Sequence, residues 1–474
     1  MSTVFYIFLA EQERIEYNSG NRKKKKTVSC LRSMRRALIA RAGRKTSQRI
    51  WKMNYKESVE YINSSRWFGS KRGLESFGRF LASLGEPQKK LRCVHIAGTN
   101  GKGSCAAMCA SVLKAAGYRT GLFTSPYLHR FNERMQMNGK EIGDETLAEI
   151  ATRVRTAAEK AEDHPTAFEM MTACAFLWFA EEKCDIVVLE TGLGGRFDAT
   201  NIVEKPEVSV IMNIGLDHTQ ILGGSIAEIA GEKAGIIKPG CDCVLYQQSG
   251  EAEDVIRSVC KEKGAPLRTA DFSQIIPEFD SLEGQVFSYK GTPFALPLLG
   301  AYQQRNASVV IETAEVLRKK GWKIPPEALE HGLYAVSWPA RFEVLADDPY
   351  FVLDGGHNPQ CASELVENLS HYFPEQKHII LSGVLRDKDY ASIFSILGKS
   401  GSEFVCITPD SPRALPAEEL ADFLRRNGMK ATACNTIADG VYEALDRAKT
   451  CGGMVCAAGS LYLAGPIREI FGCY

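Results

Sequence analysis

The sequence has no long apolar run and no paired cysteine motif. None of its apolar runs approaches the roughly 20 residues needed to span a bilayer, so we expect no membrane association. Its fifteen cysteines include no Cys-x-x-Cys pair. Cys241 and Cys243 are one residue apart and have no neighbouring histidines, which argues against a zinc site. Scattered cysteines are typical of a reducing compartment, which predicts a cytoplasmic protein.

The sequence also lacks a large net charge. The 474 residues carry a formal net charge of +1, but residues 1–52 hold 14 Lys and Arg against three Asp and Glu. The rest of the chain therefore has a net charge of −10, which argues against a nucleic acid partner. We predict that residues 1–52 are a disordered basic extension, or sequence upstream of a natural start at Met53. A transit segment or a nucleic-acid-binding arm is the alternative.

The regular phosphate-binding loop, Gly-x-x-x-x-Gly-Lys-Ser/Thr, is absent too. In the segment "GTNGKGS", Gly98 to Ser104, only two residues separate the first two glycines, where the regular motif has four. In addition, Gly103 separates Lys102 from Ser104. It nevertheless follows an apolar strand at 91–97 and precedes a helix at 104–116. In that setting glycines let backbone N–H groups approach an anion, and Lys102 can reach the outer phosphates of a nucleotide. A glycine turn with a solvated lysine is the alternative.

Apolar strands alternate with helices along the rest of the chain and predict an α/β fold. The strands "DIVVLE" and "VSVIM" are continuously apolar, as in a parallel sheet covered by helices on both faces. Between about 241 and 300 the pattern changes to short segments with Gly and Pro. The stretch "SWPARFEVL" around Pro339 is interpreted as a hinge, and further parallel strands follow it. The length predicts two domains, at residues 53–338 and 345–474.

Polar residues follow several of these strands and predict a site at one sheet edge. Glu190 ends a buried strand, where a carboxylate beside a triphosphate would hold Mg²⁺. Asp198 lies in the following loop and is a possible ligand for substrate or metal. His218 follows the next strand, and Lys233 has apolar neighbours that suggest partial burial. Each residue taken alone is equally compatible with a surface or structural role.

The second half of the chain repeats this arrangement. Arg341 lies in the predicted hinge, and Asp354 ends an apolar strand in the motif "DGGHNP", which also contains His357. Lys388 and Ser460 follow later strands. Together these residues predict a second wall of the site, which faces the wall formed by the residues of the first half of the chain.

Seven motifs in order carry a family resemblance. They are "GTNGKGS", "TSPYLHRFNER", "ETGLGGRFDATN", "NIGLDHTQILG", "EKAGIIK", "WPARFEVL" and "DGGHNP". From Met53 onward the chain resembles the folylpolyglutamate synthase/dihydrofolate synthase family of the Mur ligase superfamily, and within it a bacterial bifunctional member. The resemblance implies an N-terminal P-loop-type ATPase domain with a mainly parallel sheet and a C-terminal Rossmann-like domain that supplies glutamate. It covers no part of residues 1–52.

The resemblance implies an ATP-dependent ligase that adds L-glutamate to dihydropteroate, to the γ-carboxylate of a reduced folate, or to both. It also implies a monomer. The catalytic residues would be Lys102, His218 and Lys233, the last of them carbamylated. One Mg²⁺ would be held by Ser125 and Glu190, and a second by His218. The ATP-binding residues would be Gly98, Thr99, Asn100, Gly101, Lys102, Gly103, Ser104, Asn306, Arg341 and Asp354. The substrate-binding residues would be Thr166, Phe168, Glu169 and Asp198 on the pterin side, and His357 and Ser460 for glutamate.

Three other functions are compatible with parts of the sequence. A Mur-type ligase acting on a UDP-muramyl precursor would keep the ATP loop, but no UDP-binding N-terminal domain is recognisable. A non-catalytic nucleotide-binding regulator is a second alternative. The motifs retain their lysine, acidic and histidine residues, which argues against a loss of catalysis. A nucleic-acid binder acting through the basic residues 1–52 is the third.

Overall fold

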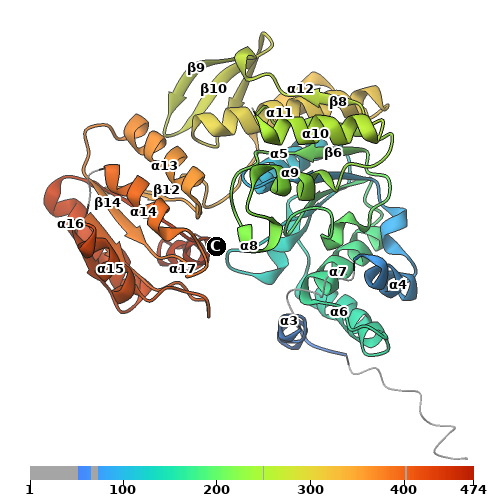
Figure 1. The fold of residues 1–474 in the computed structure, drawn as a ribbon, viewed down its shortest axis with the longest axis horizontal. Coiled ribbons are helices and arrows are strands. Elements are labelled where there is room, and N and C mark those ends of the chain that lie inside the picture. Colours follow the sequence, from blue (N-terminus) through green and yellow to red (C-terminus); the bar gives the residue numbers. More distant parts are fainter. Residues whose placement is uncertain (1–51, 66–72, 249, 401–402, 474) are drawn as a thin grey trace, which may run out of the picture. The chain divides into compact units, whose positions relative to one another are not determined.

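The N-terminal sheet is built on the continuously apolar strands of the sequence (Figure 1). The computed structural model describes residues 52–65, 73–248, 250–400 and 403–473, so the predicted extension lies outside the described residues except for Lys52. Eight strands lie in the order β4-β3-β2-β5-β1-β6-β7-β8, and all pair in parallel except β3 and β4. Their bounds are β1 Cys93–Ala97, β2 Thr120–Phe123, β3 Met135–Met137, β4 Lys140–Glu141, β5 Ile186–Glu190, β6 Val208–Ile211, β7 Asp242–Leu245 and β8 Leu267–Thr269.

Helices bury both faces of this sheet, as the apolar strands require. One face packs on α5 (Lys102–Ala115), α11 (Ala301–Lys319) and α12 (Pro326–Tyr334). The other face packs on α7 and its neighbours toward one edge and on α9 and α10 toward the other. The helices on this second face are α3 Tyr55–Ser64, α4 Glu75–Ser83, α6 Asp144–Ala158, α7 Ala167–Glu181, α9 Ile226–Ala234 and α10 Glu251–Glu262, with the short α8 Thr219–Leu222 near the strand ends.

The region between 241 and 300 is more regular than the sequence predicted. The sequence pattern did not predict α10, because the apolar stripe of this helix is narrow. Its buried residues are only Ala252, Ile256 and Cys260. The same region forms a three-stranded antiparallel sheet of β9 (Ile275–Ser281), β10 (Gly284–Tyr289) and β11 (Thr292–Leu296). Buried Glu312 of α11 ties this sheet to the domain by pairing with Lys290 and accepting a hydrogen bond from the Tyr289 hydroxyl at 2.7 Å.

The C-terminal sheet has six strands in the order β12-β13-β17-β14-β15-β16. Only β12 is antiparallel, and it contains the end of the segment "SWPARFEVL", whose role as a hinge stays a prediction. The strands are β12 Glu343–Asp347, β13 Tyr350–Leu353, β14 His378–Ser382, β15 Glu403–Cys406, β16 Ala431–Ala433 and β17 Met454–Ala458. The helices are α13 Pro359–Tyr372, α14 Tyr390–Leu397, α15 Ala417–Arg426, α16 Ile437–Cys451 and α17 Ala464–Ile470.

The predicted α/β architecture, with a mainly parallel N-terminal sheet and a second α/β sheet after it, is thus confirmed. Contacts within residues 53–474 make one compact unit that contains both sheets. Among the helices of the described residues, none is long and apolar enough to cross a bilayer.

Candidate active site

The glycine loop connects β1 to α5 and is shaped by close contact with the end of β6. A Cβ atom on Gly98 would lie 2.6 Å from Cβ of Met212, so only glycine fits there. Gly101 has a φ of 81° and precedes the first turn of α5. The helix begins at Lys102, two residues earlier than predicted, and the Lys102 ammonium donates to the Thr99 carbonyl oxygen at 3.0 Å. The loop therefore presents backbone N–H groups and a cation at a helix N-terminus.

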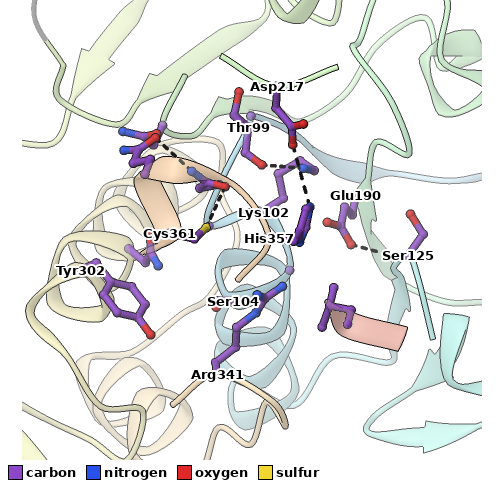
Figure 2. A pocket seen from close by; sticks show the side chains of 18 of the residues that line it. Thr99, Lys102, Ser104, Ser125, Glu190, Asp217, Tyr302, Arg341, His357 and Cys361 are labelled. Atoms are coloured by element: carbon purple, nitrogen blue, oxygen red, sulfur yellow. Dashed lines mark hydrogen bonds and ion pairs between the residues drawn. The ribbon is translucent and has the colours of Figure 1, made fainter. Parts of the chain in front are cut away.

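This loop lines a pocket of about 210 Å³ that residues from the C-terminal part of the chain also line (Figure 2). The pocket brings together most of the predicted site. The predicted residues that line it are Gly98, Thr99, Asn100, Gly101, Lys102, Gly103, Ser104, Ser125, Glu190, His218, Lys233, Asn306, Arg341, Asp354 and His357. Residues more than 200 positions apart in the sequence therefore share one cavity.

Glu190 is held at the end of β5 with its carboxylate turned toward the loop (Figure 2). Its Oε2 accepts a hydrogen bond from the Ser125 backbone N–H at 3.0 Å, and the side chain is buried. Burial raises the pKa of Glu190, and the nearby Lys102 ammonium opposes that shift. A buried carboxylate with one such donor, beside a serine hydroxyl, offers the hard oxygen ligands that Mg²⁺ prefers. Among the residues described, no group of three or more His, Cys, Asp and Glu is arranged so that it could hold a metal ion, so the remaining ligands would come from phosphate or water.

Lys233 lies on α9 and is almost completely buried, with 3% of its surface exposed. Its ammonium donates to the Gly98 carbonyl oxygen at 2.7 Å, directly behind the glycine loop. Burial, with repulsion from Lys102, lowers the pKa of Lys233 to about 7. A substantial fraction of Lys233 is therefore a neutral amine at physiological pH.

Asp217 joins the pocket residues of the N-terminal part of the chain to those of the C-terminal part. Its carboxylate accepts from the Lys388 ammonium at 2.8 Å, and Nε2 of His218 and of His357 each lies 3.9 Å from its other oxygen. Despite its burial, the pKa of Asp217 is lowered to about 2, chiefly by the Lys388 charge. Nε2 of His218 is 3.5 Å from the Lys388 ammonium, so a metal ion at His218 would require Lys388 to move. The second magnesium site stays a prediction.

We expect Asp217 and Lys388 to be strongly coupled in stability. Their side chains are only 12% and 8% exposed, and removing one partner of such a buried pair costs about 3 kcal/mol. A double-mutant cycle with Asp217→Asn and Lys388→Met, read by chemical denaturation, should give a coupling free energy above about 1 kcal/mol. The exposed pair of Arg386 and Glu419 is the control, with an expected coupling of at most about 0.5 kcal/mol. Equal coupling in both cycles would contradict the expectation.

Hydrogen bonds in the loop after β13 hold the pocket residues that the C-terminal part of the chain contributes. The Asp354 carboxylate accepts from the backbone N–H of Phe342 at 2.9 Å and of Gly356 at 2.7 Å. Burial raises the pKa of Asp354, and the Arg341 charge opposes this. Asn358 caps α13 and also donates to the Asn100 side-chain oxygen at 2.8 Å. The glycine loop and the "DGGHNP" loop are thereby hydrogen-bonded to each other.

Five predicted substrate residues do not line this pocket. Thr166 and Glu169 form a capping box at the start of α7, and the Phe168 ring packs against Gly192. Asp198 is buried and accepts hydrogen bonds from the backbone N–H groups of Gly192 and Leu193, which shapes the loop after β5. The remaining one is Ser460, whose hydroxyl accepts from the Tyr462 backbone N–H. All five have local structural roles, and their contact with substrate stays a prediction.

Other pocket residues were not predicted as site residues. Tyr302 lines the pocket one helical turn before Asn306 on α11, so the i, i+4 spacing could have identified it. Gln360 and Cys361 immediately follow the "DGGHNP" motif and contact Asn100. Asp217 precedes His218, but its pairing with Lys388 has no local signal because 171 residues separate them.

Comparisons with known proteins identify the family. Residues 96–314 match the Mur ligase middle domain, and residues 340–461 match the Mur ligase glutamate ligase domain. The chain is 38% identical to the dihydrofolate synthase/folylpolyglutamate synthase of Bacillus subtilis, over 88% of this chain and 98% of that protein.

Solved structures give the same result. A Mycobacterium tuberculosis folylpolyglutamate synthase complexed with ADP and AMPPCP superimposes with a TM-score of 0.81 at 30% identity, over 88% of this chain and 99% of that one. Escherichia coli FolC in complex with DHPP and ADP superimposes with a TM-score of 0.78 at 28% identity, over 89% and 98%. The chain therefore belongs to the folylpolyglutamate synthase/dihydrofolate synthase family of ATP-dependent ligases.

Proposed function

We propose that this protein uses ATP to join L-glutamate to dihydropteroate and to the terminal γ-carboxylate of a reduced folate. The observation that carries the proposal is the single pocket in which the glycine loop, Glu190 and Lys233 face Arg341 and His357. The similarity to a relative named for both synthase activities supports the same substrates. A UDP-muramyl substrate is not favoured by these relatives.

The chemistry requires activation of a carboxylate, which is a poor electrophile. An oxygen of the pterin-side carboxylate attacks the γ-phosphorus of ATP, the bond to the bridging oxygen breaks, and ADP leaves. The amine of glutamate then attacks the carbonyl carbon of the acyl phosphate. The tetrahedral intermediate expels phosphate, and the amine proton is lost to a base or to solvent. Because acyl phosphates hydrolyse readily, the pocket must exclude water during both steps.

The residues of the loop would position and neutralise the phosphates. In this proposal the N–H groups of Gly98 to Ser104 and the Lys102 ammonium bind the phosphate chain. Ser125 and Glu190 would hold one Mg²⁺, which supplies positive charge to the transferring phosphoryl group when bound. Asn306, Arg341 and Asp354 would contact the nucleotide from the other side.

Lys233 would act in a modified form. A substantial fraction of its amine is neutral near pH 7 and could add to CO2, with loss of a proton, to give a carbamate. The modification replaces a cation with an anion behind Gly98, where it would orient the metal and the loop. His357 and Ser460 would contact glutamate, and Thr166, Phe168, Glu169 and Asp198 would contact the pterin side.

The direct test is ADP formation that depends on both dihydropteroate and L-glutamate, with the product identified by mass. We expect turnover with dihydropteroate and, in a second assay, with a reduced folate. Turnover of the folate alone would restrict the protein to polyglutamylation and withdraw the pterin-side residues. ATP binding without any amide product in either assay would contradict the proposal and favour a non-catalytic role.

A further inference from the structure

Arg134 is a buried cation in the motif "TSPYLHRFNER" that the proposed reaction has not used. It ends the short 3-10 helix Phe131–Arg134 before β3, and only 4% of its surface is exposed. Its guanidinium carbon lies 4.9 Å from the ring centroid of Tyr127 and 5.7 Å from that of Phe131. The two rings hold the guanidinium in a defined position.

This guanidinium has no anionic partner in the part of the chain that the structure describes. No hydrogen bond or ion pair joins its nitrogens to another group there, and its Nε is fully buried and unsatisfied. The neighbouring Arg130 pairs with Asp144, and the other buried arginine, Arg468, pairs with Glu343. Burying an unpaired charge is costly, so the position of Arg134 is unfavourable unless an anion joins it.

The place of Arg134 connects it to the ligase pocket. The Thr124 backbone N–H donates to its carbonyl oxygen at 3.0 Å, so Arg134 pairs with the segment that leads into the pocket residue Ser125. Its charge acts on Glu190 and on Tyr462, and Leu461, next to Tyr462, lines the same pocket. Arg134 is not among the residues that line the pocket, but its backbone pairs with the segment that enters the pocket, and its charge acts on the pocket residue Glu190.

We propose that Arg134 binds a carboxylate of one of the two substrates of the ligation. This inference rests on the proposed function, because that reaction brings carboxylates to the site from incoming glutamate and from the pterin-side acceptor. A guanidinium binds a carboxylate through two parallel hydrogen bonds, and partial desolvation strengthens both. The phosphates of ATP have their own cation in Lys102 and the loop N–H groups. Arg134 is a binding and positioning residue that fixes one substrate relative to the acyl phosphate.

The decisive variant is Arg134→Met, which keeps much of the apolar stem and removes the charge. We expect the KM of one carboxylate substrate to rise roughly 10- to 100-fold and the KM of ATP to change less than about twofold. The ligand-free variant should melt at the same temperature as the wild type or higher, because an uncompensated buried charge has been removed. Arg130→Met is the matched control, since Arg130 is half exposed and already paired. It should leave every KM unchanged.

The outcome assigns the source of the carboxylate. A raised KM for glutamate alone assigns Arg134 to the incoming amino acid, and a raised KM for the pterin substrate assigns it to the acceptor. Unchanged KM values for both would overturn the inference, whatever happens to stability. If Arg134→Met fails to fold, Arg134→Lys keeps the charge without the planar fork and is judged by the same KM values. If the wild type shows no turnover, the proposed function fails first, and substrate-induced shifts in melting temperature of wild type and variant decide the role of Arg134.

Discussion

Replacing Lys102 with alanine is expected to lower kcat/KM roughly a thousandfold or more, with the larger part of the loss in kcat. Lys102 starts α5 and reaches the Thr99 carbonyl of the glycine loop, so its ammonium lies where outer phosphates would bind. Negative charge develops on the transferring phosphoryl group, and a cation fixed in a partly closed pocket stabilises it more than water does. Steady-state ADP release with saturating glutamate and pterin substrate measures the effect.

The control for this variant lies on the same helix. Lys114 is exposed in the last turn of α5 and does not line the pocket, so Lys114→Ala should keep wild-type kcat. Both variants should melt within a few degrees of the wild type, because neither side chain fills the core. If Lys102→Ala raised only the KM of ATP and left kcat intact, Lys102 would contribute to ground-state binding alone.

The parts of the site that the sequence could predict are those with a local cause. The glycine loop is one, because a buried strand, three glycines and a helix adjoin each other in the chain. The position of Glu190 is another, since the last residue of a buried parallel strand must lie at the ligand-binding edge. Lys233 was recognised as partly buried from its Ala and Ile neighbours, and its burial is confirmed.

Other features depend on contacts that no local pattern encodes. The pairing of Asp217 with Lys388 joins two loops that only the packing of the two sheets brings together. The missing partner of Arg134 is a property of the folded chain, because the motif itself contains Glu133, whose carboxylate is occupied by backbone N–H groups of residues 128–130. Conversely, the spacing of Thr166 and Glu169 is a capping-box pattern that could have been recognised as structural.

Replacing Lys233 with alanine is expected to lower kcat roughly a hundredfold to a thousandfold, and added acetate or formate should restore part of it. The rescue is expected because the proposed carbamate would place a carboxylate-like anion behind Gly98, and a small acid can enter the space that the truncated side chain leaves. In the wild type the pKa of about 7 means that the neutral amine increases as the pH rises from 6 to 8. Activity in CO2-depleted buffer should therefore recover on adding bicarbonate, more completely at pH 8 than at pH 6. Intact-protein mass measurement should detect the added CO2.

Lys238→Ala separates this chemistry from a simple loss of packing. Lys238 is half-buried and, like Lys233, donates to a backbone carbonyl, that of Asn201 at 3.0 Å, but it does not line the pocket. Its variant should show neither a large loss of kcat nor rescue by acetate. Should Lys233→Ala lose activity and melting temperature together, without rescue by any small carboxylate, the lysine would act only as a support for the Gly98 carbonyl. In that case the hydrogen bond of 2.7 Å, and not a carbamate, would be the reason for its burial.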